Sequence, residues 1–194
     1  GYAVFSVTGE GQSRWAAIGL GLLLAATGLI EGTVVGLAQW WAMRRALRDL
    51  TRLAWWLATL VGSLVAWLFG TLPSTVIGMQ AQVNGVAPQE PPLTSVLLLA
   101  AAMGAVVGPV LALPQWFMLR RHVTRAWRWI PAHSLAWALG MPLIFAGIDV
   151  AQRTDSVVLA VLLMGVTLAL SGAVVGTVHG TVLVRMAEQA NAPT

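Results

Sequence analysis

Charged side chains are scarce in this 194-residue chain, of which aspartate, glutamate, lysine and arginine make up only 9%. Water-soluble domains carry about 25% charged residues, so this chain has too few charges to cover a soluble surface. Hydrophobic residues make up 58% of the chain, and its mean hydropathy is +0.79. Several apolar runs reach the roughly 18 residues that can cross a bilayer. The composition therefore excludes a soluble globular domain and predicts an integral membrane protein.

Cysteine is also absent, which excludes a disulfide framework and a thiolate metal site. The chain lacks the HExxH, GxSxG, Walker and GxGxxG motifs that are typical of common enzyme classes. Its few acidic residues are scattered, so no metal site is predicted. Its basic residues cluster at the ends of apolar runs rather than on one continuous face, which argues against nucleic acid as a partner. We therefore expect a protein with no catalytic residues.

The apolar runs predict one all-α domain over residues 1–194, a polytopic transmembrane helical bundle. The five expected spans cover residues 15–43, 53–72, 93–119, 129–148 and 156–184. The first, third and fifth are long enough that they must tilt in, or project from, a hydrocarbon core of about 30 Å. The second and fourth are near the minimum length for crossing it. The polar, proline-containing segment 79–92 is expected to be the largest connector.

The distribution of arginine predicts how the helices insert. The connections after the first and third spans carry four arginines each, and Arg185 follows the fifth span, whereas only Arg14 and Arg153 lie on the opposite side. Because arginine-rich loops stay in the cytoplasm, we expect these connections and the C-terminus to face the cytoplasm of a bacterial inner membrane, with the start of the chain outside. Seven tryptophans are expected to form an aromatic belt at the arginine-rich boundary: Trp40, Trp41, Trp55, Trp56, Trp116, Trp127 and Trp129.

The three long segments resemble one another. "GLIEGTVVGLAQWWAMRR", "GAVVGPVLALPQWFMLRR" and "LALSGAVVGTVHGTVLVR" align without gaps, as expected for duplicated hairpins. Small residues four apart form a ridge along each helix: Gly28, Gly32 and Gly36, then Gly104 and Gly108, then Gly172, Gly176 and Gly180. Such ridges permit close backbone approach between helices in lipid. Either the three long helices pack on one another within the chain, or the ridges bind another subunit or a flat cofactor.

The spacing of the repeats predicts one more helix. The matching residues Arg45, Arg121 and Arg185 are 76 and 64 residues apart. A first unit of that length would begin about 20 to 30 residues before Gly1, which is the length of one transmembrane helix. We therefore expect a sixth, N-terminal span that completes three hairpins, with a cleaved signal peptide as the alternative explanation.

A wider resemblance follows from the same motifs. Glycine ridges that lead into QWxxxRR, alternating with tryptophan-rich helices such as "LAWALG", resemble those of a group of uncharacterised bacterial multi-pass membrane proteins. The resemblance covers most of the chain. It implies a multi-pass membrane fold built from repeats, and it implies no activity.

Polar residues recur at one depth of the expected bundle. Three of them precede an arginine by six residues: Gln39, Gln115 and His179. This spacing places them about 9 Å inside the arginine-rich boundary. His133, five residues after Arg128 on the returning helix, lies at nearly the same depth. The layer has two interpretations: the side chains form interhelical hydrogen bonds, or His133 and His179 bind a haem or chlorin beside Gly176 and Gly180.

Glu31 stands apart because the aligned positions hold Val107 and Ser171. Carboxylates inside membrane spans are candidate functional groups, so Glu31 is either part of a proton relay or substrate path, or a contact to a neighbouring helix or partner. We expect the chain to be a non-catalytic integral membrane subunit within a larger assembly, surrounded by lipid and bound to other membrane subunits or to itself. The alternatives are a haem- or chlorin-binding protein using His133 and His179, and a small transporter or proton path through Glu31.

Overall fold

The computed structural model describes residues 14–84 and 91–190, and every regular element in these two ranges is helical. The elements follow in the order α1 (Arg14–Met43), α2 (Arg52–Asn84), α3 (Leu93–Leu119), the 3-10 turn η2 (Ala126–Arg128), α4 (Trp129–Gln152) and α5 (Val157–Ala190). The expected all-α class is therefore confirmed. The sixth helix expected before residue 1, and residues 85–90 of the expected connector, lie outside the described residues.

Three helical segments are long and apolar enough to cross a membrane: Leu93–Leu119, Ala126–Gln152 and Val157–Met186. The expected span ends are corrected at three helices. α2 continues beyond residue 72 to Asn84, so the first part of the expected connector is helical, and α4 and α5 end at Gln152 and Ala190 rather than at residues 148 and 184. A helix satisfies its own backbone hydrogen bonds, so it can continue beyond the most apolar part of its sequence at little cost.

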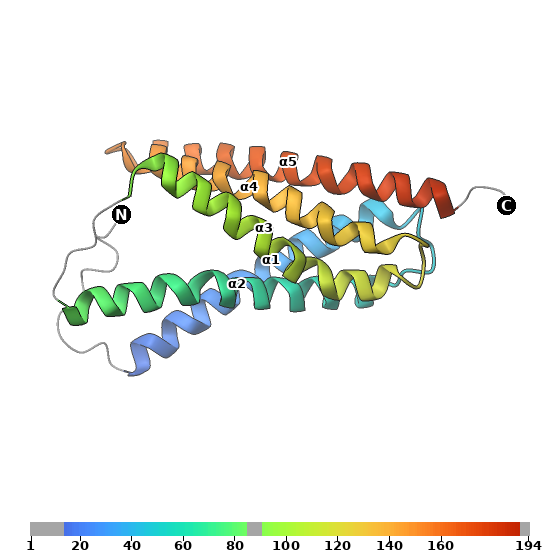
Figure 1. Cartoon of the computed structure of the whole chain (residues 1–194), viewed down its shortest axis with the longest axis horizontal. Helices are drawn as coiled ribbons and strands as arrows, with labels where there is room; N and C mark the ends of the chain where they lie inside the picture. Colours follow the sequence, from blue (N-terminus) through green and yellow to red (C-terminus); the bar gives the residue numbers. More distant parts are fainter. Residues whose placement is uncertain (1–13, 85–90, 191–194) are drawn as a thin grey trace.

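The helices run back and forth along one long axis (Figure 1). α5 lies along α4 at one edge of the molecule, and α1 and α2 lie together on the opposite side. The α1–α2 connection, the α3–α4 connection and the C-terminal end of α5 all lie at the same end. The arginines of both connections therefore gather at one end of the molecule, together with Arg185.

The arginine-rich end is held together by an apolar core that draws on all five helices and both connections. Its buried members are Met43, Leu47, Leu50, Trp55, Ala112, Leu119, Val123, Ala126, Trp129 and Met186. The two connections make the same turn into this core. The backbone N–H of Leu47 donates to the Met43 carbonyl at 2.9 Å, and that of Val123 donates to the Leu119 carbonyl at 3.0 Å. Each turn places one apolar side chain under the helix ends.

The expected tryptophan belt is only partly correct. Trp41 and Trp127 are 65% and 60% exposed, as interfacial anchors should be. Trp55 and Trp129, however, are 0% exposed, and their ring centroids lie 6.2 Å apart inside the core. These two indoles fill the space where the helices converge, because only a large side chain can do so without leaving a cavity.

Candidate functional site

A buried polar cluster joins four helices near the arginine-rich end. The amide of Gln115 lies at its centre: Nε2 donates to Gln39 Oε1 at 3.1 Å and to Thr59 Oγ1 at 2.9 Å, and Oε1 accepts from Trp129 Nε1 at 2.8 Å. Thr59 in turn donates to the Trp55 carbonyl at 2.9 Å. These partners come from α1, α2 and α4, so one α3 side chain connects four helices. The expected interhelical bond between two glutamines is therefore confirmed.

Two histidines extend the cluster to α5. The rings of His133 on α4 and His179 on α5 stack with their centroids 3.9 Å apart and 24° between their planes. The Trp129 ring lies 4.6 Å from the first imidazole and 4.9 Å from the second. Both histidines are buried, and neither His133 Nδ1 nor His179 Nε2 bonds to another protein atom. Ring stacking, rather than a side-chain hydrogen bond, therefore joins α4 to α5 at this level.

This arrangement does not fit a tetrapyrrole held between His133 and His179. Two axial ligands must approach the iron from opposite faces of the macrocycle, whereas these two rings contact each other directly. The open space beside Gly176 lies on the exposed face of α5, whereas the His179 ring is buried against Trp129 and His133. Across residues 14–84 and 91–190, no three histidine, cysteine or acidic side chains converge as metal ligands would.

Glu31 lies outside the polar cluster, on α1 between the first two glycines of its ridge. Its Oε2 accepts a hydrogen bond of 2.8 Å from Trp67 Nε1 on α2. A neighbouring hydrogen bond, 3.3 Å long, runs from Trp56 Nε1 to Thr33 Oγ1. Glu31 thus contacts the adjacent helix α2 through this hydrogen bond.

The glycine ridges of α1 and α3 are both covered, although not by each other. A Cβ built on Gly32 would lie 2.9 Å from Ser63 Oγ on α2. On α3 the approach is closer still, because a Cβ on Gly104 or Gly108 would meet the α4 backbone at Trp137 and His133. The long helices therefore pack on α2 and α4, and the expectation that the three ridges pack on one another is wrong for these two.

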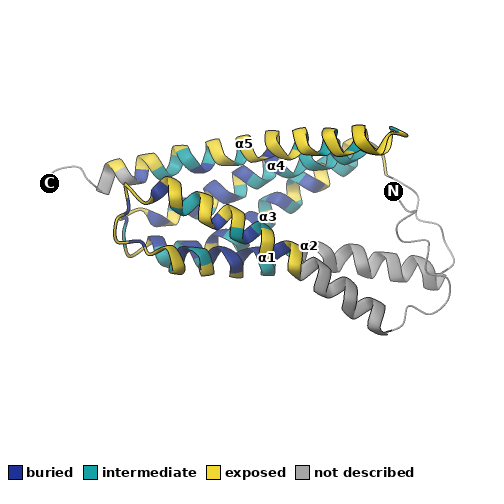
Figure 2. Cartoon of the chain, turned by 180° about the vertical axis from the view of Figure 1, so that it is seen from behind, coloured by how far each residue is buried: buried dark blue, intermediate teal, exposed yellow. Residues whose placement is uncertain are grey.

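Among the described residues, nothing covers the glycine ridge of α5. A Cβ built on Gly172, Gly176 or Gly180 would meet no described atom within 4 Å, and the same is true of Gly165 near the other end of the helix. Only 6% of the most apolar part of α5 is buried, against 22% for α3 and 22% for the segment that contains α4. Exposed residues accordingly run along α5 in Figure 2, whereas buried residues gather on its neighbours.

No family model, curated protein or solved structure matches this chain. Two features stand out in the part of the molecule that the structure describes. One is the polar cluster around Gln115, whose groups are turned toward one another. The other is the row of α5 glycines, which is turned outward and has no neighbour.

Sequence reasoning misses two members of the polar cluster. Thr59 gives a weak signal, since a hydroxyl inside an apolar helix can bond to the carbonyl four residues earlier, as it does here with Trp55. Trp129 resembles a member of the interfacial belt because it adjoins Arg128 in the sequence. A buried indole N–H usually has an acceptor, and Gln115 provides it for Trp129, whereas the buried Trp55 Nε1 has no partner among the described residues.

Proposed function

We propose that this chain is a non-catalytic integral membrane subunit that assembles with other membrane protein through the exposed glycine ridge of α5. The observation that carries the proposal is the contrast between covered and uncovered glycines. Gly32 and Gly108 approach a neighbouring helix so closely that an added methyl group would lie less than 3 Å from it, whereas no described atom lies within 4 Å of a Cβ at Gly172 or Gly176.

The cost of glycine supports this proposal. In a helix interior, each glycine is about 1 kcal/mol less favourable than alanine. Close helix packing offsets that cost on α1 and α3. On α5 the described residues supply no such contact, so we infer that another helix lies against the ridge and offsets the cost. A ridge of small residues is also the kind of surface that helices use in lipid, because they associate there through close backbone approach rather than through the hydrophobic effect.

We further propose that all five helices cross the bilayer as parts of repeated hairpins, with the arginine-rich end in the cytoplasm of a bacterial cell. The positive-inside rule supports this orientation, since arginines are concentrated in the two connections at that end. At the opposite end, Arg153 forms an ion pair of 2.8 Å with Asp149, which offsets its charge locally.

The mass of the purified particle tests the proposal. We expect the protein, extracted with a mild detergent and measured by native mass spectrometry, to exceed the 20.5 kDa of one chain. Gly176→Leu should reduce the particle to one chain, and Ala102→Leu, at an exposed position on α3, should leave the particle unchanged. A wild-type protein that stays at the mass of one chain, both in detergent and in lipid nanodiscs, would contradict the proposal.

A proton path through Glu31 makes a different prediction. If Glu31 only connects α1 to α2, Glu31→Gln retains an oxygen that accepts from Trp67, so the free energy of unfolding should change by less than about 0.5 kcal/mol. Pyranine fluorescence in proteoliposomes should then show the same proton permeability for both proteins. Proton flux that is present in the wild type and lost in Glu31→Gln would favour the path instead.

A further inference from the structure

We infer that the arginine-rich end binds two phospholipids, one through Arg44 at the end of α1 and one through Arg120 at the end of α3, and that each guanidinium holds the phosphate of an anionic headgroup. Lipid binding of this kind rests on the membrane insertion of α1 and α3 proposed above, but not on what lies against α5. Three observations lead to it: the direction of the two side chains, their free hydrogen-bond donors, and the contrast with α5.

Arg44 and Arg120 both fold back along the helix that they follow. Cζ of Arg44 lies 5.4 Å from the centroid of the Trp41 ring. Cζ of Arg120 lies 4.5 Å from the centroid of Phe117 and 5.2 Å from that of Trp116. Helical side chains lean toward the N-terminus of their helix, which for α1 and α3 is the direction of the bilayer. Both charges are therefore held beside aromatic rings at the membrane boundary, which is the level of the lipid headgroups.

The contact with the rings leaves the hydrogen-bond donors of both arginines free. A cation–π contact uses the charge of a guanidinium but none of its N–H groups. Within residues 14–84 and 91–190, neither Arg44 nor Arg120 donates to a protein acceptor, and the salt bridge there joins Arg153 to Asp149. Both side chains are exposed. A guanidinium in this state can bind two oxygens of one phosphate at the same time.

The two arginines lie at one depth but on different sides of the bundle. Gln39 on α1 and Gln115 on α3 are joined by a hydrogen bond of 3.1 Å, and each precedes the arginine of its helix by five residues. At about 1.5 Å per residue, both arginines lie about 7.5 Å beyond that bond. Five residues also turn a helix about 140° past a full turn. Each arginine therefore points away from the other helix, so the two sites take separate lipids.

The surrounding charges favour an anionic headgroup over a zwitterionic one. The acidic residues of this end are Asp49 and Glu188, whereas nine of the eleven arginines of the chain lie there: Arg44, Arg45, Arg48, Arg52, Arg120, Arg121, Arg125, Arg128 and Arg185. An ethanolamine or choline group would bring a further positive charge beside these arginines. The glycerol of phosphatidylglycerol brings none, so its phosphate is attracted without an opposing term.

α5 shows what this end looks like without the site. In the alignment of the three long helices, Val184 takes the position of Arg44 and Arg120, and Thr181 takes the position of the exposed aromatic ring. The arginine that remains, Arg185, is exposed and contacts no ring in the described part of the chain. The third repeat therefore keeps a positive charge but not the aromatic support, so it provides a matched comparison within one molecule.

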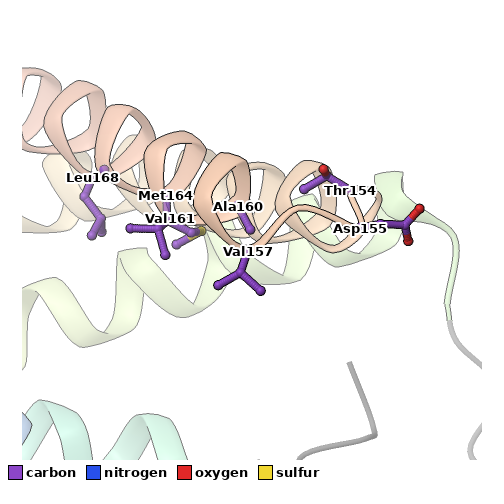
Figure 3. A pocket seen from close by; sticks show the side chains of 8 residues that line it. Thr154, Asp155, Val157, Ala160, Val161, Met164 and Leu168 are labelled. Carbon is purple, nitrogen blue, oxygen red and sulfur yellow. The ribbon is translucent and has the colours of Figure 1, made fainter.

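The opposite end of the molecule offers no such donor among the described residues. The guanidinium of Arg153 is already occupied, because its Nε and Nη2 donate to the two carboxylate oxygens of Asp149 at 3.0 Å each. A hollow of about 540 Å³ beside the start of α5 is lined by apolar side chains such as Val161 and Leu168, with Asp155 at its edge (Figure 3). A carboxylate repels a phosphate, so the lipid sites are confined to the arginine-rich end.

Counting bound lipids tests the inference. Protein in a mild detergent, titrated with phosphatidylglycerol, should carry two lipids per chain in native mass spectra. Arg44→Gln and Arg120→Gln should each weaken binding of one lipid by about tenfold, since each removes a charged hydrogen-bond donor. Arg48→Gln is the matched control and should keep both lipids, because Arg48 is exposed in the same connection and contacts no ring among the described residues. Equal losses in Arg44→Gln and Arg48→Gln would show that only the summed charge attracts lipid, and the inference would be wrong.

Two further titrations identify the ligand. Phosphatidylethanolamine should bind more weakly than phosphatidylglycerol, and an excess of inorganic phosphate should leave phosphatidylglycerol bound, because the acyl chains add contacts with the apolar helix surface. Displacement of the lipid by inorganic phosphate would show that the two arginines bind the free ion, which contradicts a lipid site. Equal binding of the two lipids would contradict the preference for an anionic headgroup.

The third repeat allows a gain of binding to be measured, which remains decisive if an arginine variant impairs folding. Thr181→Trp/Val184→Arg rebuilds the pair on α5, where both positions are exposed, and should bind a third lipid per chain. Val184→Arg alone adds the charge without the ring and should not. A rebuilt α5 that binds no third lipid would contradict the role of the aromatic ring.

Failure of the proposed function is read separately. The wild-type spectra also count the chains in each particle, so a particle of one chain with two bound lipids would contradict the proposed assembly and leave the lipid sites standing. Release of the protein from membranes by alkaline carbonate without detergent would contradict the proposed membrane insertion, and the lipid sites with it.

Discussion

The ridges of α3 and α5 share a sequence pattern but differ in their surroundings. Gly108 and Gly172 occupy matching positions of the sequence alignment. The first faces the backbone of α4 so closely that no side chain would fit, and a Cβ on the second would have no described atom within 4 Å. A small-residue ridge therefore encodes the capacity for close helix contact, whereas the position of the helix in the bundle decides whether that capacity is used within the chain.

The position of each helix explains the difference. α3 packs on both α2 and α4, so its ridge is covered as the chain folds, whereas α5 follows α4 along the edge (Figure 1). The other side of α5, with Ser171 and Val175, faces Gly140 on α4. Between α3 and α4, the longer helix α3 contributes the glycines of the contact. Between α4 and α5, the shorter helix α4 contributes the glycine. The following predictions test how far this contrast between α3 and α5 extends, from the largest expected effect to the smallest.

Gly108→Ala should have the largest effect. The methyl group would meet the carbonyl of His133 and the N–H of Ser134, which are backbone groups that cannot rotate away. Overpacking of this kind costs about 3 kcal/mol or more. We expect most of the protein to be lost as aggregate, measured as the monodisperse fraction in size-exclusion chromatography. A Gly108→Ala variant with wild-type yield and unfolding midpoint would show that α3 and α4 are not in backbone contact.

Gln115→Leu should have the next largest effect. It tests whether α3 and α5 also differ at the matching polar residues that follow their ridges, Gln115 and His179. Gln115 makes three side-chain hydrogen bonds, whereas the matching His179 makes none through Nε2. The substitution leaves the buried Trp129 N–H unpaired, so we expect destabilisation of about 2 kcal/mol. His179→Leu should cost less, because it removes only ring stacking. Denaturation in sodium dodecyl sulfate, followed by tryptophan fluorescence, compares the two variants, and equal effects would contradict this order.

Much of the fold could be predicted from the sequence because depth and helix length are encoded locally. α3 begins and ends where expected, at Leu93 and Leu119, since prolines precede it and a pair of arginines follows it. The end of α2 could not be predicted, because a helix that leaves the apolar region loses no backbone hydrogen bonds and need not stop there. Asn84 lies 12 residues beyond the expected end at residue 72.

The depth of the polar residues in the bundle could be predicted from the sequence, but the direction in which each one faces around its helix axis could not. The distance from the nearest arginine placed Gln39, Gln115, His133 and His179 in one layer, and the structure brings them together. Which neighbour each side chain faces depends on how the helices pack, and that is a property of the whole bundle. For the same reason, the sequence could not distinguish the covered ridge of α3 from the uncovered ridge of α5.

Gly32→Ala should have an intermediate effect on stability, because the neighbours of this glycine are side chains. A Cβ at this position would lie 2.9 Å from Ser63 Oγ and 3.2 Å from Leu60 Cδ2. Both groups can move by rotating about side-chain bonds, so we expect a cost of about 1 kcal/mol. The double variant Gly32→Ala/Ser63→Ala should recover part of this loss in the same denaturation assay. No recovery would indicate that the α1 and α2 backbones, rather than Ser63, limit the approach.

Gly172→Ala should have the smallest effect on the single chain, and we expect no loss of stability from it. In the part of the chain that the structure describes, no atom lies within 4 Å of the added methyl group, and alanine is favoured over glycine in a helix by up to about 1 kcal/mol. The unfolding midpoint should therefore equal or exceed that of the wild type when the protein is diluted into detergent as single chains. In native membranes the same methyl group would enter the proposed contact between α5 and another membrane helix, so the fraction of assembled protein should fall. A loss of stability in the single chain would show instead that the α5 ridge is covered from within, as the α3 ridge is.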